Sequence, residues 1–588
     1  MPLLRPRGLH LPIEQAGQAD RSANTRTGIE KMTKNKTDRP APVTTPQGGA
    51  ANALYQAMIG GAGPEATGWA GPLHFPVPRR RGEKVLILGA GVAGLTAAYE
   101  LSLLGFDCTV LEAQNRVGGR NRTARKGDKL YELDDVTGEP VHTHTCRFDD
   151  NMYLNLGPGR IPYHHRRVLK YCRDFKVALE PYVMETTANL VRPPHLEKTL
   201  PNRRVANDTR GYLAAKLAET LAETDSFTGE LRDLLRVFGA LDVNGKYKGS
   251  TRSGYLDDPV IEEPFPTPAP PLPFEELVES GFWKARFYQP VDYLWQATMF
   301  QPAGGMDKVV DALAREARLA GAEIVLQAEV TDIRLETKGP GVTVQYLKGG
   351  KECEARARYC VSNIPVPLLD DDIELDGFSD AFEKAIGIVE FAKTCKVGWQ
   401  ANRRFWEGDL DGIHDTEGIY GGISWTAHNI TQLWYPSNDY FSAKGTLTGA
   451  YNFGDQADEL GNLSPDDRIE LAREGAAQLH PEFADRSVVP DDKAVTIAWH
   501  KVPYQEGGWA DWKQSRKDHK EAYRQLLQPE GGDVFYVTGD QISPLPGWQE
   551  GAMMSAHYVT QQILGIMPLS VPEVVSVPDS VALTQGLF

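Results

Sequence analysis

A glycine-rich turn, with an acidic residue spaced behind it, is the part of this chain whose residue types point most directly to chemistry. The run from Lys84 to Gly94 reads KVLILGAGVAG, and Glu112 ends a second apolar run. In a strand–turn–helix of this kind, Gly89 permits the tight turn, Gly91 lets backbone approach a pyrophosphate, and Gly94 brings helix and strand close. The helix N-terminus faces the phosphates, and Glu112 can hold a ribose hydroxyl. The pattern predicts a dinucleotide-binding βαβ unit.

The segment that follows indicates which dinucleotide is bound. Residues 110–123 read VLEAQNRVGGRNRT, which resembles the flavin-contact segment of the FAD-dependent amine oxidase superfamily. In that family the paired glycines and the arginine lie against the pyrophosphate and the flavin. Arg120 would offer a planar, permanently charged fork to phosphate oxygens. A solvated arginine in a turn is the plainer alternative.

Three distant segments extend the resemblance. Residues 533–541 (DVFYVTGDQ) resemble the C-terminal FAD signature, so Asp540 would accept a hydrogen bond from the ribityl chain, and a helix over 549–564 would aim its N-terminus at the flavin. Residues 301–313 and 329–334 are also similar to family segments, and Val330 would sit by the adenine. The resemblance implies FAD as cofactor. Its implied contacts are Gly89, Gly91, Ala93, Gly94, Glu112, Ala113, Gly119, Arg120, Gly157, Pro158, Gly159, Arg160, Val330, Trp499, Gly539, Asp540, Gly547 and Trp548.

Arg160 carries the resemblance to one branch of the superfamily. Residues 155–162 read NLGPGRIP, similar to the L-amino acid oxidase branch, where a GPxR segment supplies an arginine to the substrate carboxylate. A bidentate arginine–carboxylate pair fixes orientation as well as adding binding energy. The alternative is an arginine bound to a cofactor phosphate or a structural carboxylate. Oxidases of simple amines do not need this arginine.

Two further residues gain catalytic roles from the resemblance. Lys396, in AKTCKVGWQ, aligns with the family lysine that holds a water near flavin N5. A partly desolvated ammonium there could steer dioxygen reduction or position the hydrolytic water. Tyr451 would share the substrate carboxylate, and Phe453 would line the side-chain pocket. The plainer alternatives are a solvent-facing lysine and a core tyrosine.

The remaining predicted site residues follow aromatic and glycine-containing segments. The carbonyl of Gly547 would accept from the substrate amine, and Trp548 would wall the reacting carbon. Trp499 resembles the aromatic that opens another active-site segment, with Trp509 on the loop after it. Glu506 is interpreted either as recognising a cationic side chain or as a surface carboxylate.

Charge and composition argue against several kinds of partner and against a membrane-spanning protein. The net charge of -16 argues against nucleic acid or an anionic membrane as partner, and no apolar stretch reaches the roughly 20 residues of a membrane span. Six scattered cysteines show neither disulfide nor metal spacing, which favours a reducing compartment. The sequence shows no Sec signal and no transmembrane segment, so a cytoplasmic protein is expected, with secretion by another route left open. His164 and His165 are interpreted as residues at a helix start or supporting the site, and no metal site is expected.

These residues need elements to position them. The expected fold is mixed α/β, with a discontinuous Rossmann-like FAD-binding domain of the amine oxidase type, a sheet-based substrate domain and a helical insertion. The expected boundaries are 1–82 for a partly mobile N-terminal extension, 83–165, 299–370 and 491–570 for the FAD-binding domain, 166–298 for the helical insertion, 371–490 for the substrate domain and 571–588 for a C-terminal tail.

The resemblance implies an L-amino acid oxidase of amino acid catabolism. Hydride transfer to FAD from an L-amino acid with a large aromatic, apolar or basic side chain would give a 2-oxo acid and ammonia, with dioxygen and water as co-substrates and hydrogen peroxide as product. Because homodimers are usual in the family, a homodimer or higher homo-oligomer is expected. The alternatives are an amine or polyamine oxidase and a non-oxidase flavoprotein (a mutase or an inert FAD-binding module), and partial monooxygenase chemistry also stays open.

Overall fold

The structure is a computed structural model that describes residues 82–134, 136–222, 224, 228–256, 267–285, 298–408, 417–513 and 515–565. The predictions about the N-terminal extension and the C-terminal tail lie outside these residues. The chain divides into two units, Met1–Gly48 and Gly49–Phe588, and every described residue belongs to the second.

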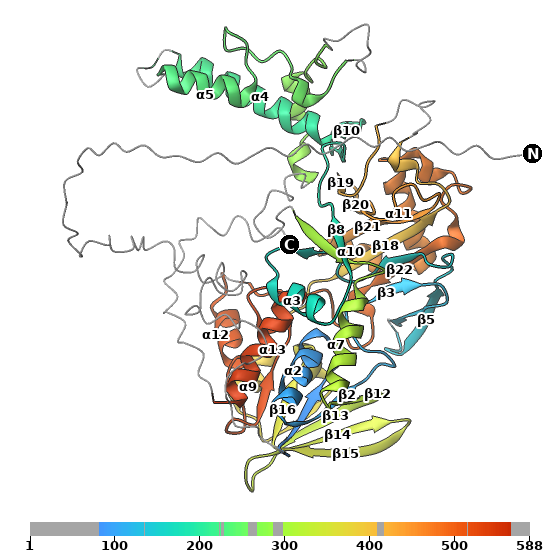
Figure 1. Cartoon of the computed structure of the whole chain (residues 1–588), viewed down its shortest axis with the longest axis vertical. Helices are drawn as coiled ribbons and strands as arrows, with labels where there is room; N and C mark the ends of the chain where they lie inside the picture. The colour runs from blue at the N-terminus through green and yellow to red at the C-terminus, as the bar shows by residue number, and fades with distance from the viewer. Residues whose placement is uncertain are drawn as a thin grey trace, which may run out of the picture. The chain divides into compact units, whose positions relative to one another are not determined.

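A parallel sheet of five strands, in the order β12-β2-β1-β16-β23, forms the centre of the nucleotide-binding part (Figure 1). Its strands come from segments far apart in the chain, so this part of the fold is discontinuous. Apolar runs such as KVLIL suit a parallel sheet, whose strands are buried on both faces. The fold class predicted from the sequence is confirmed. The strands are β1 (Lys84–Leu88), β2 (Asp107–Glu112), β12 (Glu323–Leu326), β16 (Tyr359–Ser362) and β23 (Phe535–Val537).

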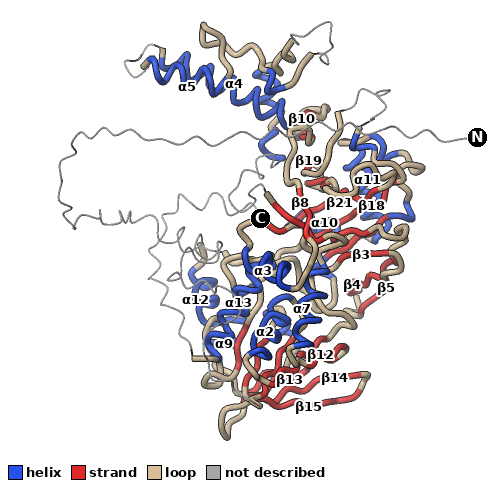
Figure 2. The backbone as a smooth tube through the Cα atoms, in the orientation of Figure 1, coloured by secondary structure: helices blue, strands red, loops and turns tan. Residues whose placement is uncertain are grey.

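Helices α2, α7 and α13 pack together beside this sheet in one apolar core (Figure 2). Nearly every residue of α2 is buried because the helix has packed neighbours on several sides. The predicted helix at 549–564 is confirmed as α13. The bounds are α2 (Val92–Leu103), α7 (Asp307–Leu319) and α13 (Gln549–Ile563), with α3 (Arg166–Asp174) against α13, and with α8 (Val366–Asp371), α9 (Asp380–Ile386) and α12 (Lys517–Leu526) elsewhere in this part.

A second sheet of four strands, β15-β14-β13-β17, is mostly antiparallel. Gly349 and Gly350 both have positive φ (58° and 73°), the backbone that a two-residue hairpin turn requires. The strands are β13 (Ala328–Leu335), β14 (Val342–Lys348), β15 (Lys351–Ala357) and β17 (Glu374–Asp376).

A third sheet of seven strands, β10-β9-β19-β20-β21-β18-β22, carries most of the residues predicted to contact substrate. Helices α10 (Asp455–Gly461) and α11 (Pro465–Ala477) pack against its strands. All residues of β18 are buried, which takes Lys396 out of solvent. The strands are β9 (Leu190–Arg192), β10 (Leu200–Pro201), β18 (Thr394–Ala401), β19 (Ile423–Thr426), β20 (Gln432–Trp434), β21 (Gly445–Phe453) and β22 (Ala494–Ala498).

Strand pairing crosses the predicted domain boundaries, which themselves stay a prediction. Range 166–298, expected to be helical, contains α4, α5 and α6 but also β8, β9 and β10, and the last two extend the seven-stranded sheet. Likewise β22, in range 491–570, pairs with β18, and β17, in range 371–490, pairs with β13. Strands of two to four residues are too short to show an alternating pattern. The remaining bounds are α4 (Asn202–Leu221), α5 (Gly229–Gly239), α6 (Phe274–Glu279), β3 (Thr123–Arg125), β4 (Lys129–Leu133), β5 (Pro140–Thr145), β6 (Tyr153–Asn155), β7 (Ile161–Pro162), β8 (Leu179–Tyr182) and β11 (Met299–Pro302).

Candidate active site

The turn between β1 and α2 has no room for side chains. Gly89 has φ 94°, and its amide donates to the carbonyl of Leu111 at 2.7 Å. A Cβ on Gly94 would lie 2.0 Å from the carbonyl oxygen of Gly89, and one on Gly91 would lie 2.6 Å from the Asn363 side chain. The backbone amides at the start of α2 are therefore open to a close ligand, as a pyrophosphate requires.

Glu112 is held against this turn from the end of β2. Its carboxylate accepts from the amides of Ala90 (2.7 Å) and Gln114 (2.8 Å). Burial raises the pKa of Glu112, and these two hydrogen bonds counter part of the effect. Ala93 lies in the first turn of α2, and Ala113 follows Glu112 directly. This arrangement fits an acidic residue that holds a ribose hydroxyl.

Replacing Glu112 by alanine should weaken FAD binding roughly 10- to 100-fold, because a hydrogen bond to a charged group contributes about 1.5–3 kcal/mol. The measurement is titration of the apoprotein with FAD, followed by quenching of flavin fluorescence. Glu323→Ala, on the neighbouring strand β12 with an exposed side chain, is the matched control. Equal affinities in the two variants would remove Glu112 from the cofactor site.

Arg120 and Asp540 form an ion pair that joins distant parts of the chain. Arg120 also donates to the carbonyl of Gly508, and Asp540 accepts from the amide of Gly547 at 2.8 Å. Gly119, with φ 53°, lies against Gly91, since a Cβ there would be 3.7 Å from the Gly91 Cα. The predicted FAD-contact segments thus converge beside the glycine-rich turn, and Gly539, with φ 124°, directly precedes the aspartate.

The Gly-Pro-Gly-Arg segment lies between the loop that carries Arg120 and the seven-stranded sheet. A Cβ on Gly157 would lie 1.9 Å from the carbonyl oxygen of Arg120, and one on Gly159 would lie 2.7 Å from the ring of Trp434. Pro158 restricts the backbone between them. Neither glycine tolerates a side chain, so the segment brings Arg160 to a defined place between cofactor loop and sheet.

Arg160 is buried in an aromatic enclosure. Its guanidinium carbon lies 4.4 Å from the centroid of the Trp434 ring and 5.9 Å from that of Tyr182. Burial lowers the pKa of Arg160, and the hydroxyl groups of Tyr182 and Tyr451 counter part of this shift. Stacking on aromatic faces is a common way to hold a guanidinium out of water.

Lys396 is a second buried cation in the same enclosure. Its Nζ donates to the carbonyls of Gly157 and, at 3.3 Å, Asn155. The same atom lies 4.7 Å from the ring centroids of both Trp434 and Tyr451. Burial and the charge of Arg160 lower the pKa of Lys396 to about 7. The ammonium can therefore gain or lose a proton near neutral pH.

Aromatic side chains continue from this cluster along the sheet. Tyr451 pairs with Lys396 across β18 and β21, and burial raises the pKa of its hydroxyl to about 12. The ring of Tyr451 meets that of Phe453 at 5.7 Å, and Phe453 meets Trp509 at 5.9 Å. Trp509 in turn contacts Gly547, whose φ of 79° brings the backbone close to the indole. The structure thus connects Arg160 to Gly547 through predicted substrate-contact residues.

Trp548 and the two histidines meet where two helices begin. His165 is the N-cap of α3, Trp548 is the N-cap of α13, and their rings lie 4.9 Å apart at 90°. His164 is equally buried beside them. The helix-start interpretation of His165 is confirmed. Trp499 lies under the Gly-Pro-Gly-Arg segment, and its indole donates to the carbonyl of Leu156 at 2.9 Å.

Glu506 and Val330, two of the predicted site residues, have neighbours outside the aromatic enclosure. Burial raises the pKa of Glu506, and so do the neighbouring charges of Asp372 and Asp371, at the end of α8. The charged groups near Glu506 are therefore carboxylates. They are not the cations of the Arg160 cluster, the group formed by Arg160, Lys396, Trp434 and Tyr451. Val330 packs in the core that contains Leu111 of β2, on the nucleotide side.

Sequence reasoning missed Glu550 and Arg167. Glu550, in the first turn of α13, is fully buried and accepts from the amides of Arg167 (3.0 Å) and Val168 (3.1 Å) at the start of α3. The Arg167 side chain pairs with the same carboxylate at 3.1 Å. The carboxylate thus accepts from two amides at the N-terminus of α3, and its negative charge also lies in the first turn of α13, where a helix dipole favours it. An acidic residue in a first helical turn is too common a signal to have indicated this role.

Replacing Glu550 by alanine should lower the free energy of unfolding by roughly 3–5 kcal/mol, because it leaves the Arg167 charge buried and unpaired. The measurement is urea-induced unfolding of the holoprotein. Glu470→Ala, which alters an ion pair between half-exposed side chains, is the control and should change stability by less than about 1 kcal/mol. A Glu550→Ala protein as stable as the control would contradict the proposed coupling of α3 and α13.

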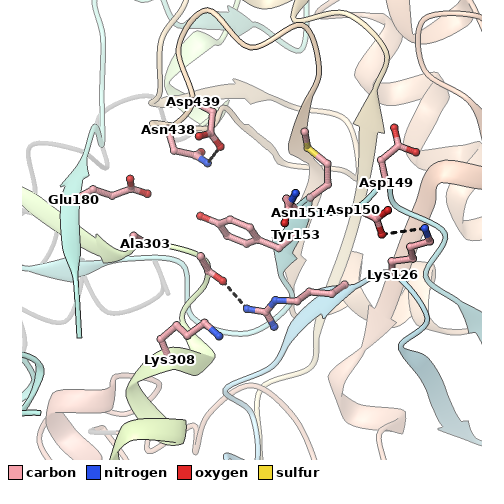
Figure 3. A pocket seen from close by; sticks show the side chains of 13 residues that line it. Lys126, Asp149, Asp150, Asn151, Tyr153, Glu180, Ala303, Lys308, Asn438 and Asp439 are labelled. Carbon is pink, nitrogen blue, oxygen red and sulfur yellow. Dashed lines mark hydrogen bonds and ion pairs between the residues drawn. The ribbon is translucent and has the colours of Figure 1, made fainter. Parts of the chain in front are cut away.

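A surface cavity of about 500 Å³ lies apart from this cluster (Figure 3). Tyr153 reaches into it from β6 toward Glu180, and Arg125 and Lys308 border it from β3 and α7. Several lining charges are already paired, including Arg125 with Asp307. None of its lining residues belongs to the Arg160 cluster. Within the described ranges, no group of three or more acidic, cysteine or histidine side chains could hold a metal ion, and no helix could cross a membrane.

The chain belongs to the flavin-containing amine oxidoreductase family, whose pattern matches residues 92–564. FAD is accordingly its cofactor, and the glycine-rich turn, Glu112, Arg120 and Asp540 fit that group. The family and the cofactor predicted from the sequence are confirmed.

The chain is similar to individual oxidases over most of its length. The chain is 28% identical over 508 residues to the flavin-dependent L-tryptophan oxidase RebO of Lentzea aerocolonigenes, covering 81% of this chain and 96% of that protein. It is 25% identical over 487 residues to an L-amino-acid oxidase of Crotalus adamanteus, covering 80% of this chain and 85% of that protein. Among solved structures, a redesigned putrescine oxidase superposes with a TM-score of 0.52 at 18% identity, covering 83% of this chain and all of that one, which shows a shared fold.

Proposed function

We propose that this flavin-dependent amine oxidoreductase is an L-amino acid oxidase. The overall reaction converts an L-amino acid, dioxygen and water into a 2-oxo acid, ammonia and hydrogen peroxide. The observation that carries the proposal is the pair of buried cations, Arg160 and Lys396, in one aromatic enclosure. Two relatives that this chain matches over most of their length support it: one is named as an L-tryptophan oxidase and the other as an L-amino-acid oxidase.

The charge of the enclosure selects among amine substrates. Burial is the larger cause of the lowered pKa of Lys396, and the charge of Arg160 adds to it. The permanent charge of Arg160 gives the enclosure a positive potential. A carboxylate would be attracted there and could take both N–H groups of the guanidinium. A protonated amine or diamine would be repelled, because charges in a low-dielectric site are weakly screened. An amino acid brings the required carboxylate, and a simple amine does not.

The chain's own residues can then orient the substrate. Arg160 would bind its carboxylate, and the Tyr451 hydroxyl, protonated at neutral pH, would donate a second hydrogen bond to it. Gly547 and Trp548 would border the amine and the reacting carbon. When bound, FAD supplies the two-electron redox chemistry, with dioxygen as final acceptor. Lys396 can hold a proton or a water molecule near neutral pH because its pKa is about 7.

The side-chain pocket favours a large apolar or aromatic substrate. Phe453 and Trp509 continue the wall that starts at Tyr451. Glu506, the candidate for recognising a basic side chain, has Asp371 and Asp372 as its charged neighbours. The described contacts of the Arg160 cluster therefore support an aromatic rather than a basic amino acid.

Inhibitor binding tests the charge argument without turnover. The holoprotein is titrated with 3-phenylpropanoate, which has the carboxylate alone, and with 2-phenylethylamine, which has the amine alone, and the flavin absorbance is recorded. The carboxylate should bind at least about 10-fold more tightly, equivalent to about 1.4 kcal/mol. Tighter binding of the amine would overturn the proposal in favour of an amine oxidase.

A further inference from the structure

Tyr182 is brought beside Arg160 by the three-stranded sheet β7-β11-β8. Arg160 directly precedes β7, and Met299 of β11 pairs with Pro162 of β7 on one side and with Tyr182 of β8 on the other. Residues paired in this way have their side chains on the same face of a sheet. The pairing therefore fixes Tyr182 near the end of the Gly-Pro-Gly-Arg segment, although α3 separates the two outer strands in the sequence.

The ring of Tyr182 forms part of the aromatic enclosure. Tyr182 is 7% exposed and shares an apolar core with Trp434, against which Tyr451 also packs. The guanidinium carbon of Arg160 lies 5.9 Å from the centroid of the Tyr182 ring. Of the two phenols that raise the pKa of Arg160 against the effect of burial, Tyr182 has the larger influence. Tyr182 therefore borders the same cation as Tyr451, the tyrosine already assigned to the substrate carboxylate.

The hydroxyl of Tyr182 is buried and forms no hydrogen bond with any residue that the structure describes. Arg160 is near enough to counter part of the rise in pKa that burial gives this phenol, but the two groups do not meet in hydrogen-bond geometry. The hydroxyl therefore keeps its proton at neutral pH and has no acceptor for it. Buried polar groups are rarely left in this state, because an unpaired donor in a protein interior is costly. A ligand that supplies an acceptor would remove that cost.

We propose that the Tyr182 hydroxyl is a third donor to the substrate carboxylate, together with Arg160 and Tyr451. This step rests on the L-amino acid oxidase function proposed above. A carboxylate can accept about four hydrogen bonds, so two from the guanidinium leave room for one from each phenol. The guanidinium attracts any anion, whereas two phenols at fixed positions also require the acceptor atoms to lie where a carboxylate has them.

The Tyr182 hydroxyl distinguishes amino acids from simple amines. An amine offers no acceptor beside Arg160, so the hydroxyl stays unpaired when an amine binds and adds nothing to its affinity. An amino acid gains a hydrogen bond to a charged group, and such a bond changes affinity about 10- to 100-fold. Tyr182 would thus add to the preference for amino acids that the charge of Arg160 already gives.

Titration of the holoprotein with 3-phenylpropanoate and with 2-phenylethylamine, followed by flavin absorbance, tests the proposal without turnover. Tyr182→Phe removes the hydroxyl and keeps the ring, so the dissociation constant of the carboxylate should rise about 10-fold and that of the amine should not change. Tyr435→Phe is the matched control, because the hydroxyl of Tyr435 is also buried but bonds to Ser424 (2.7 Å) and His480 (2.6 Å). The control should leave both dissociation constants unchanged.

Thermal unfolding of the same variants separates substrate binding from a structural role. Tyr182→Phe should not lower the Tm of the ligand-free holoprotein, because the lost hydroxyl had no partner, whereas Tyr435→Phe should lower it, because two hydrogen bonds are lost. Equal affinity of Tyr182→Phe and the wild type for 3-phenylpropanoate, or a fall in Tm as large as that of Tyr435→Phe, would overturn the role of Tyr182 and leave the oxidase function standing. A wild type that binds 2-phenylethylamine more tightly than 3-phenylpropanoate would contradict the oxidase function itself, and this proposal with it.

Discussion

Replacing Arg160 by alanine should lower kcat/KM for the preferred L-amino acid roughly 100- to 1000-fold, mainly through KM. Truncating one partner of a buried charge pair costs about 2–5 kcal/mol, and 1.4 kcal/mol corresponds to a factor of 10. The variant removes the guanidinium that lies 4.4 Å from the Trp434 ring centroid. Steady-state peroxide production against substrate concentration measures the effect.

Two comparisons separate this role from a structural one. Arg160→Lys keeps the charge but loses the planar fork, so it should recover part of the lost affinity. The 3-phenylpropanoate titration should show a loss of affinity similar to the loss in KM, while binding of 2-phenylethylamine should not weaken. Normal kinetics in Arg160→Ala would show that the arginine does not bind the substrate carboxylate.

Replacing Lys396 by methionine should slow reoxidation of the reduced enzyme by dioxygen roughly 100-fold, within the range typical of positioned acid–base groups. Methionine has a similar volume but carries no charge. In the wild type the pKa of Lys396 is about 7, so the ammonium is present below that pH and is lost above it. The reoxidation rate should therefore fall as pH rises from 6 to 8 in the wild type and stay level in the variant. Stopped-flow mixing of reduced enzyme with oxygenated buffer measures both.

Lys393→Met is the matched control for this experiment. Lys393 lies just before the same strand, but its side chain is half exposed and pairs with Asp458 at 2.7 Å. Its reoxidation rate and pH profile should equal those of the wild type. If Lys396→Met and Lys393→Met behave alike, Lys396 has no part in the reaction with dioxygen.

The cofactor-binding turn could be predicted from the sequence because its chemistry is local. Gly89 and Gly94 are required by backbone geometry within one strand–turn–helix, and the close contact between them is present in the structure. The helix at 549–564 was similarly predictable from its position after the Gly-Asp motif and became α13. In motifs of this kind the required residues lie a fixed number of positions apart in the sequence, so they can be recognised without knowledge of the fold.

The aromatic enclosure could not be predicted in the same way. Trp434 contacts Arg160, Lys396 and Tyr451, yet it lies on a three-residue strand with no motif around it. Its role depends on strand order in the seven-stranded sheet, which comes from contacts far apart in the sequence. The short strands β9 and β10 were missed for the same reason, because they are defined by their partners rather than by their own pattern.

The surroundings of Glu506 could not be predicted from the sequence either. Its place three residues before Trp509 is compatible both with recognition of a cationic substrate side chain and with a surface carboxylate. The backbone at Glu506 has φ 59°, an uncommon conformation for a residue with a side chain, and the charges of Asp372 and Asp371 raise its pKa. Both features depend on the folded path of the loop and on α8, which is far away in the sequence.

The central claim is tested most directly by a peroxide-coupled assay of the purified holoprotein. The substrates are the twenty L-amino acids, their D-forms, and amines such as putrescine and 2-phenylethylamine. The account predicts peroxide from L-amino acids alone, strongest with large aromatic or apolar side chains. Activity with amines alone would remove Arg160 from its assigned role, and no peroxide with any of them would contradict the oxidase function itself.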